Sequence, residues 1–274
     1  MVQPRFVRVN DLDIAVRSYN ASSPDAIILI HFNSGSSAGW QQQISSPLLN
    51  NYHLITIDLP GHGDSSKSTA PETDYTLAAI ADAIAKVISS LKLKSFIMAG
   101  ISLGTNIIGE SVPYLSGCKG YLLAAPSIIG ANMGPGDILK PYPYGDVLFS
   151  ANPPADRLEQ YLKGLTYNYN EQRLHYLKEQ FRKTDPLFRV NMGKAISEGR
   201  WADEIGNLKA SGKPVAVIFG QDEQLCYTDY LDNAGLELWG NKVWVIPHAG
   251  HLVNFDEPEV FNELLAGFAA DVFK

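Results

Sequence analysis

The sequence has little cysteine, no long apolar run and no excess of positive charge. Its two cysteines, Cys118 and Cys226, are far apart and have no Cys or His at metal-ligand spacing. This pattern fits a reducing compartment and argues against a disulfide framework or a structural zinc site. No segment reaches the ~18 consecutive apolar residues of a membrane-spanning helix, and the first residues lack the basic and apolar regions of a secretion signal. We therefore expect a cytoplasmic protein, neither exported nor membrane-embedded.

The charge balance also excludes some classes of partner. Twenty-two basic and twenty-nine acidic residues give a formal net charge of −7, and no cluster of Lys and Arg stands out. Binding to nucleic acid or to an anionic lipid surface is therefore not expected. Apolar residues, by contrast, are plentiful: 45% of the 274 residues are hydrophobic, enough to bury the core of one α/β domain with an insertion. The sequence does not indicate an oligomeric state.

Strand-like and helix-like patterns alternate along most of the chain. The segments RFVRV and LDIAVRSY, joined by ND, predict an opening hairpin. Residues 75–93 place apolar side chains three and four positions apart, as an amphipathic helix does, and residues 257–273 predict a closing helix. Runs typical of buried strands are AIILIHF, HLITIDL, SFIMAG, YLLAAPS, PVAVIFG and KVWVIP. This alternation predicts an α/β fold with a mostly parallel, twisted sheet flanked by helices.

One long segment interrupts the alternation. Between residues 131 and 207 the apolar strand runs stop, and helical spacing appears in ADRLEQYLKGL, EQRLHYLKEQF and LFRVNMGKAIS. We expect residues 131–207 to form a helical cap inserted in a core made of residues 1–130 and 208–274.

The segment SFIMAGISLGTNIIGESV, residues 95–112, changes from a strand pattern to a helix pattern at Gly100-Ile101-Ser102-Leu103-Gly104. G-x-S-x-G between a strand and a helix is typical of a nucleophile elbow, a sharp turn that holds the serine hydroxyl above the sheet. The alternative is a serine N-cap in a glycine-rich turn. As a nucleophile, Ser102 would lie at a helix N-terminus, where the Leu103 N–H could donate to a substrate carbonyl oxygen.

A serine nucleophile needs a base and a carboxylate that orients the base. After Ser102, the segment VIFGQDEQ carries Asp222 and Glu223, and the segment VIPHAGHLVNFDEPEVF carries His248 and His251. Adjacent residues that leave a strand point in different directions, so only one of the two carboxylates can face the base. The residues alone leave the choice within each pair open.

Five segments together resemble the α/β-hydrolase superfamily: HFNSGSSAGW, DLPGHGDS, GISLG, FGQDE and HAGHLVNFDEPEVF. Their spacing covers essentially the whole chain apart from the cap. The resemblance implies His251 as the base, with His248 as its rival, and Glu223, three residues after Gly220, as the acid, with Asp222 as the alternative. A serine at the elbow implies acyl transfer to water, unlike haloalkane dehalogenases and epoxide hydrolases of this fold, which use an aspartate there.

The resemblance also implies a second oxyanion donor in the loop at residues 31–35. By position the Asn33 backbone N–H is the donor and that of Phe32 is the alternative, because Phe32 stands where relatives carry glycine and its side chain restricts the backbone. His31 and the DLPGHGDS turn are expected to support the site and not to take part in the reaction. The implied chemistry requires no metal or organic cofactor.

Within the superfamily, the chain bears a closer resemblance to N-acyl-homoserine lactonases of the α/β-hydrolase type. It rests on HFNSGSS, DLPGHGDS, the cap segment DRLEQYL and the glutamate of GQDE. In that group a cap tyrosine in this segment faces the lactone, which implies Tyr161, together with Phe32 and Asn33, as substrate-binding residues. For each cap tyrosine the alternative is packing between cap helices or exposure to solvent.

Three functions are compatible with these residues. They are a lactonase that opens N-acyl-homoserine lactones (quorum quenching), a carboxylesterase for small acyl or aryl esters, and a ligand-sensing protein with vestigial turnover. The complete set of Ser102, Glu223 and His251 favours an enzyme. An acylated lactone is neutral and contains a cyclic ester that a serine–histidine pair can open. We therefore predict a serine hydrolase for a small-molecule ester or lactone, working through an acyl-enzyme.

Overall fold

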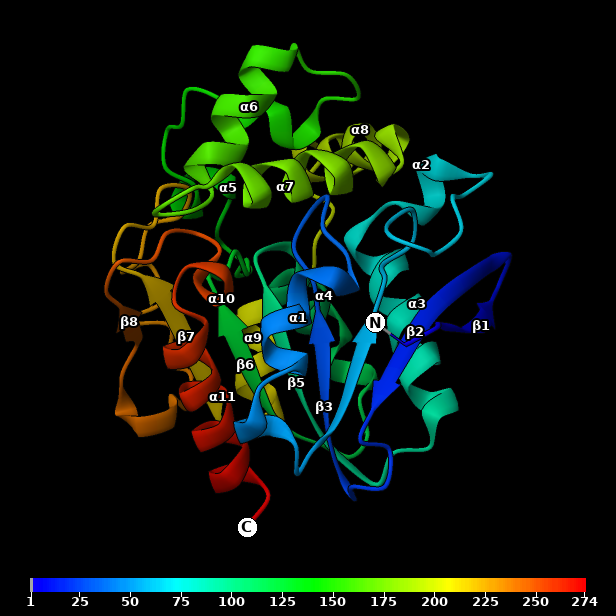
Figure 1. The fold of residues 1–274 in the computed structure, drawn as a ribbon, viewed down its shortest axis with the longest axis vertical. Helices are drawn as coiled ribbons and strands as arrows, with labels where there is room; N and C mark the ends of the chain where they lie inside the picture. Colours follow the sequence, from blue (N-terminus) through cyan, green and yellow to red (C-terminus); the bar gives the residue numbers. More distant parts are fainter. Residues whose placement is uncertain (1) are drawn as a thin grey trace.

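The computed structural model describes residues 2–274 and has an 8-stranded sheet at its centre (Figure 1). The strands are β1 (Arg5–Val9), β2 (Leu12–Tyr19), β3 (Asp25–Ile30), β4 (His53–Ile57), β5 (Ser95–Ile101), β6 (Cys118–Ala124), β7 (Val215–Gly220) and β8 (Trp244–Ile246). They lie in the order β1-β2-β4-β3-β5-β6-β7-β8. β2 is antiparallel to both β1 and β4, and the remaining pairs are parallel. The predicted fold class, a mostly parallel α/β-hydrolase sheet, is confirmed.

The apolar runs form strands that are buried on both faces, except β8 at the edge of the sheet, where Val245 is exposed. In β3 the side chains from Ala26 to Ile30 are all 0% exposed, which is why this strand shows no alternation of polar and apolar residues. Burial of one such Leu or Ile side chain contributes about 1.5–3 kcal/mol. The opening hairpin turns at Asn10, whose φ of 51° lies in the left-handed region that asparagine tolerates.

Helices cover both faces of the sheet. α1 (Gln41–Ile44) and α11 (Pro258–Val272) lie in front of it in Figure 1, and α3 (Leu77–Leu91), α4 (Leu103–Ser111) and α9 (Glu204–Ser211) lie behind. The other helices are α2 (Pro71–Asp74), α5 (Pro135–Ile138), α6 (Ala155–Gly164), α7 (Glu171–Lys183), α8 (Pro186–Ser197) and α10 (Val253–Asp256). Short 3-10 helices are η1 (Ser37–Trp40), η2 (Pro47–Leu49), η3 (Val112–Tyr114), η4 (Gly145–Phe149) and η5 (Trp239–Asn241). Between residues 2 and 274, no helix has both the length and the apolar character to cross a bilayer.

Helix α3 shows how local sequence sets an element's limits. The Thr76 hydroxyl accepts a hydrogen bond from the Ala79 N–H at 3.2 Å and caps the first turn. Lys92, with a φ of 53°, ends the helix in the left-handed conformation. Ile80 and Ile84 are fully buried, as their four-residue spacing predicts.

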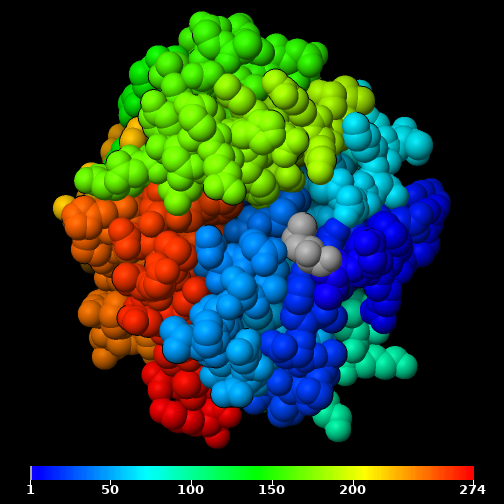
Figure 2. Space-filling view, in the orientation of Figure 1, coloured from blue at the N-terminus to red at the C-terminus, as the bar shows by residue number. Residues whose placement is uncertain are grey.

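The segment between β6 and β7 crosses the carboxyl end of the parallel strands. In Figure 1, α6, α7 and α8 lie beyond the arrowheads of β3 and β5, and in Figure 2 their green and yellow-green atoms form a layer across this end. α9 packs elsewhere, behind the sheet: a Cβ on Gly109 of α4 would lie 2.6 Å from the Glu204 Cβ. The predicted cap boundary at residue 207 therefore falls inside α9.

Candidate active site

Ser102 occupies a sharp turn between β5 and α4. Its backbone has φ 52° and ψ −123°, a conformation that a side chain disfavours and that costs of order 1–3 kcal/mol. The Ser102 N–H donates to the Ala124 carbonyl at 3.0 Å, which fixes the turn to the neighbouring strand β6. The surrounding structure thus holds this serine in a strained conformation at the start of a helix.

The two glycines of the motif are required by close packing. A Cβ on Gly104 would lie 2.4 Å from the Ile30 carbonyl oxygen, and one on Gly100 would lie 2.8 Å from the Gly104 backbone. Real Cβ atoms do not approach other atoms this closely, so any side chain here would push α4 away from β3 and β5. The G-x-S-x-G spacing is therefore a packing requirement of the turn.

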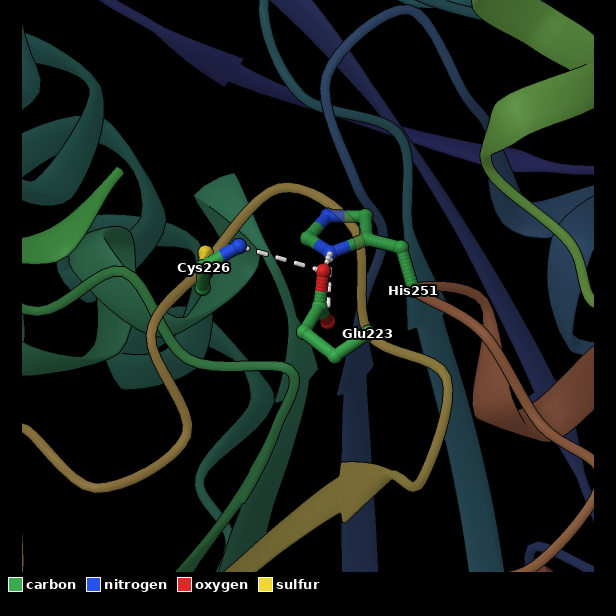
Figure 3. A group of neighbouring side chains, drawn as sticks. All are labelled: Glu223, Cys226 and His251. Carbon is green, nitrogen blue, oxygen red and sulfur yellow. Dashed lines mark hydrogen bonds and ion pairs between the residues drawn. The ribbon is translucent and has the colours of Figure 1, made fainter. Parts of the chain in front are cut away.

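His251 and Glu223 form a buried hydrogen-bonded pair. The His251 Nδ1 lies 2.9 Å from Oε2 and 3.0 Å from Oε1 of Glu223, and Figure 3 shows the ring edge facing the carboxylate. Because an ionised carboxylate only accepts, Nδ1 carries the proton and Nε2 is left as the acceptor. The Leu225 and Cys226 N–H groups also donate to Oε1, at 2.7 and 3.2 Å.

These contacts decide the charge of Glu223. Burial opposes its ionised form, but the neighbouring His251 and the hydrogen bonds from His251 and the two backbone amides outweigh burial and lower the pKa of this carboxyl. Glu223 is therefore an ionised acceptor that holds His251 in one tautomer and one orientation.

The alternatives that the sequence left open lie outside this arrangement. Asp222 is exposed, although it directly precedes the buried Glu223. His248 is also exposed, with a φ of 56° and its ring 5.7 Å from that of Tyr167. The structure thus brings Glu223 and His251 together and leaves Asp222 and His248 at the surface.

Ser102 and His251 line one cavity, together with Asn33 and Leu103. Among residues 2–274, no Lys, Arg, Asp or Glu side chain lines it. Most of its wall is apolar, and much of that wall comes from the segment above the sheet, including Ile138, Leu139, Leu148, Phe149, Met192 and Ile196. The cavity therefore suits a neutral ligand with an apolar portion.

Two backbone amides at this cavity are free to donate. Leu103 is the first residue of α4, where an N–H has no partner within the helix. In the described residues 2–274, neither the Leu103 nor the Asn33 N–H donates to another protein group. The Asn33 side chain is held in place, since its Nδ2 donates to the Leu148 carbonyl at 3.2 Å and its Oδ1 accepts from the Ser34 hydroxyl at 2.9 Å.

Two buried histidines brace the loop that carries Asn33. The Leu59 N–H donates to Nε2 of His31 at 3.0 Å, and Nδ1 of His31 lies 2.8 Å from the Phe32 carbonyl. The Ser34 N–H donates to Nε2 of His62 at 3.2 Å. Burial lowers the pKa of both histidines. They remain neutral and support the loop, as expected for His31.

Two of the three predicted substrate-binding residues do not line the cavity. Phe32 is 4% exposed and turns the other way, with its ring 6.0 Å from that of Phe255 in an edge-to-face arrangement. Tyr161 is 5% exposed, with its ring 6.5 Å from that of Tyr142. Only Asn33 of this set reaches the cavity.

Sequence reasoning missed three polar residues of the cavity wall: Asn106, Ser127 and Cys226. Asn106 follows Ser102 by four positions in α4, so helical spacing alone could have placed it on the same face. Ser127 lies just beyond β6 and donates to the Asn106 Oδ1 at 2.6 Å. For Cys226 the one available signal was its position three residues after Glu223.

The loop that carries His251 is tied to the helices above the sheet. The Leu252 N–H donates to the Leu165 carbonyl at 2.9 Å. Asp256 accepts from the Gly250 N–H at 2.9 Å and pairs with Arg173 of α7 at 2.7 Å. The position of His251 therefore depends on segments far away in the sequence.

A serine elbow after the fifth strand and a His–Glu pair at the ends of later strands define a well-known class of fold and site. The model of the alpha/beta hydrolase family matches residues 27–264, and the chain belongs to that family.

The proteins that the chain resembles have several different activities. A solved structure of the N-acyl homoserine lactonase AidH, complexed with N-hexanoyl homoserine lactone, superimposes with a TM-score of 0.90 at 24% identity, covering 99% of this chain and 98% of that one. Carboxylesterase YbfK of Bacillus subtilis is 23% identical over 89% of this chain and 79% of its own length. The dihydrolipoyllysine-residue acetyltransferase component of the acetoin cleaving system of Cupriavidus necator is 25% identical over 88% of this chain, which spans only 62% of that protein.

Proposed function

We propose that the protein is a serine hydrolase that cleaves a neutral carboxylic ester or lactone through an acyl-enzyme. One observation carries the proposal: Ser102, in its strained turn, and His251, hydrogen-bonded to Glu223, line the same cavity. A nucleophile, a base and a group that orients the base are the parts that acyl transfer requires.

In the proposed acylation step, the Ser102 Oγ attacks the substrate carbonyl carbon while His251 Nε2 takes the hydroxyl proton. The negative charge that develops on the carbonyl oxygen is stabilised by the Leu103 and Asn33 N–H groups, which are free of protein partners. Glu223 stabilises the imidazolium that forms. The carbon–oxygen bond to the leaving group then breaks, and His251 returns the proton to the leaving oxygen.

In the deacylation step, water attacks the acyl carbon while His251 takes its proton. The bond from this carbon to Ser102 Oγ then breaks, and His251 returns the proton to Oγ. With a simple ester the alcohol has already left. With a lactone the leaving hydroxyl stays attached to the acyl group, so water must attack before the ring recloses. The net change is the gain of one water and the release of a hydroxy acid.

We propose further that residues 131–207 act as a cap that supplies the binding surface for the acyl chain. Apolar side chains of this segment, such as Ile138, Phe149 and Met192, line the cavity opposite Ser102. The absence of charged side chains from its wall, over residues 2–274, favours a neutral substrate. Among such substrates we propose an N-acyl-homoserine lactone, supported by the similarity to the lactonase AidH.

A carboxylesterase for small acyl or aryl esters is the second candidate. The similarity to carboxylesterase YbfK favours it. The ratio of kcat/KM for an acyl lactone and an aryl ester of equal chain length separates the two candidates.

The test is to incubate the wild-type protein and the Ser102→Ala variant with an N-acyl-homoserine lactone near neutral pH. Mass spectrometry follows the gain of one water, corrected for spontaneous hydrolysis, and Ser89→Ala, a change of an exposed serine in α3, is the matched control. We expect fast ring opening by the wild type and by Ser89→Ala, and none above background by Ser102→Ala. Cleavage of an ester without ring opening of the lactone would favour the carboxylesterase function. Turnover of neither substrate would contradict the proposal of a serine hydrolase.

A further inference from the structure

Cys226 is a buried thiol for which the proposed reaction has no use. Its side chain is 0% exposed to bulk solvent, yet it lines the wall of the active-site cavity. Its Sγ makes no hydrogen bond with the part of the chain that the structure describes. The other buried thiol, Cys118, differs, because its Sγ donates to the Gly120 carbonyl at 3.4 Å. Cys226 is therefore the thiol with an unused sulfur at the cavity.

The surroundings of this sulfur supply two further donor atoms. The Cys226 Sγ, a carboxylate oxygen of Glu223 and a ring nitrogen of His251 all lie within 4.8 Å of one another, and all three residues are buried (Figure 3). Ligand bonds of about 2.0–2.3 Å to Zn²⁺ place the ligand atoms of one ion about 3.3–3.8 Å apart. The three side chains are thus close to the spacing that one cation requires.

The chemistry of the donor set selects the kind of cation. Thiolate sulfur and imidazole nitrogen are ligands of soft and borderline ions, whereas Mg²⁺ and Ca²⁺ prefer oxygen only. The bridge between Leu139 and Cys226 holds the cysteine loop, and the Glu223 carboxylate is fixed by two backbone amides. The Cys226 and Glu223 ligands are therefore held in place, and a cation would bind there by replacing the hydrogen bond between His251 Nδ1 and Glu223.

We propose that Cys226, Glu223 and His251 form a binding site for a thiophilic divalent cation, Zn²⁺ or Cd²⁺, and that its occupation reversibly blocks the active site. On binding, the Cys226 S–H bond breaks and its proton leaves to solvent, while the His251 proton moves from Nδ1 to Nε2. Sulfur–metal and Nδ1–metal bonds form, with no electron transfer. Water from the cavity completes the coordination. The proposal that a cation binds depends only on these three side chains. The proposal that it blocks hydrolysis also depends on the proposed function, in which His251 is the base.

Cd²⁺ is the probe for the test, because a cadmium–thiolate bond gives an ultraviolet charge-transfer absorption that other ligands do not. The wild type, Cys226→Ser, Cys226→Ala and the matched control Cys118→Ala are titrated with Cd²⁺ and followed by this absorption and by calorimetry. Circular dichroism and thermal unfolding verify that each variant is folded. The Ser102→Ala variant is titrated as well, since it separates binding from turnover.

We expect one Cd²⁺ per chain, with the absorption present in the wild type, Cys118→Ala and Ser102→Ala and absent from both Cys226 variants. Loss of an outer-shell partner weakens metal affinity about 10- to 100-fold, so loss of the sulfur should weaken it at least as much. Hydrolysis by the wild type should fall as Cd²⁺ binds and recover with a chelator, and folded Cys226→Ser should resist. The proposal is overturned if the wild type shows no such absorption, or if the absorption depends on Cys118. Binding without loss of hydrolysis would overturn the inhibitory part and also count against His251 as base.

Discussion

At the scale of single residues, two neighbours with the same charge have opposite environments. Glu223 is 4% exposed, and its carboxylate accepts hydrogen bonds from His251 Nδ1 and from two backbone N–H groups. Asp222, in contrast, is exposed. The two residues lie in a turn after β7, in which the Glu223 N–H donates to the Gly220 carbonyl at 3.2 Å, and their side chains leave this turn in different directions. A conservative amide substitution at each position therefore distinguishes the two carboxylates.

We expect Glu223→Gln to lower kcat by up to about 10⁴-fold, because an amide stabilises neither the required tautomer nor the imidazolium. Asp222→Asn, the matched control, should leave kcat near the wild-type value. Steady-state kinetics on the best substrate found measure both effects. Equal losses in the two variants would contradict the assignment of Glu223 as the acid.

The lowered pKa of Glu223 also determines how its contribution to the stability of the fold changes with pH. A carboxyl whose folded pKa is depressed contributes stability above its unfolded pKa, about 4.3 for glutamate, and loses that contribution as the pH falls through the folded value. The Glu223 carboxylate should therefore keep its charge, and this contribution to stability, in mildly acidic solution.

At the scale of elements, α7 is connected to the loop that carries His251. Arg173 of α7 donates to the Asp256 carboxylate at 2.7 Å and to the Phe255 carbonyl at 2.6 Å. The same carboxylate accepts from the Gly250 N–H, next to His251, and from the Tyr167 N–H at 2.8 Å. Asp256 thus joins α7, the α6–α7 connection and the histidine loop.

We expect Arg173→Met to lower kcat/KM about tenfold and to destabilise the fold by about 1–3 kcal/mol, because a buried carboxylate loses its charged partner. Arg182→Met changes an exposed arginine of the same helix and should alter neither quantity. Kinetics and urea unfolding at neutral pH provide the two measurements. A wild-type kcat/KM in a folded Arg173→Met protein would show that α7 does not position His251.

At the scale of the whole molecule, Glu204 connects α9, α4 and the segment after β6. It is 0% exposed, and its Oε2 accepts from the Asn106 Nδ2 at 2.9 Å and the Ile129 N–H at 2.8 Å. Its Oε1 has no partner among residues 2–274. Burial first, and the charge of nearby Glu110 as well, raises the pKa of Glu204 well above its ordinary value. The fold thus holds this carboxyl in its neutral form.

A carboxyl with a raised folded pKa destabilises the fold above its unfolded pKa, because the unfolded chain releases the proton that the folded chain keeps. We expect Glu204→Gln, which stays neutral in both states, to unfold at higher urea than the wild type at pH ~7.5 and to lose this advantage as the pH falls to ~4. Glu198→Gln, at an exposed position, is the control. A Glu204→Gln protein less stable than the wild type at both pH values would contradict the neutral state.

The sequence by itself determined where most strands and helices lie along the chain, because the spacing of apolar residues within one segment is a local property. Each predicted strand run is present, and the elbow at Ser102 follows from glycines that allow the close approach of neighbouring backbones. α9 was not predicted, since eight residues give too few turns to show a clear periodicity.

Only the tertiary structure decided which side chains meet. The pairing of Glu223 with His251, the exposure of Asp222 and the placement of Phe32 away from the cavity depend on how loops leave the sheet. Cys226 meets His251, 25 positions later in the printed sequence, because parallel strands bring their carboxyl ends to one edge. Side-chain directions in loops are set by contacts with distant segments, and a linear pattern carries no record of those contacts.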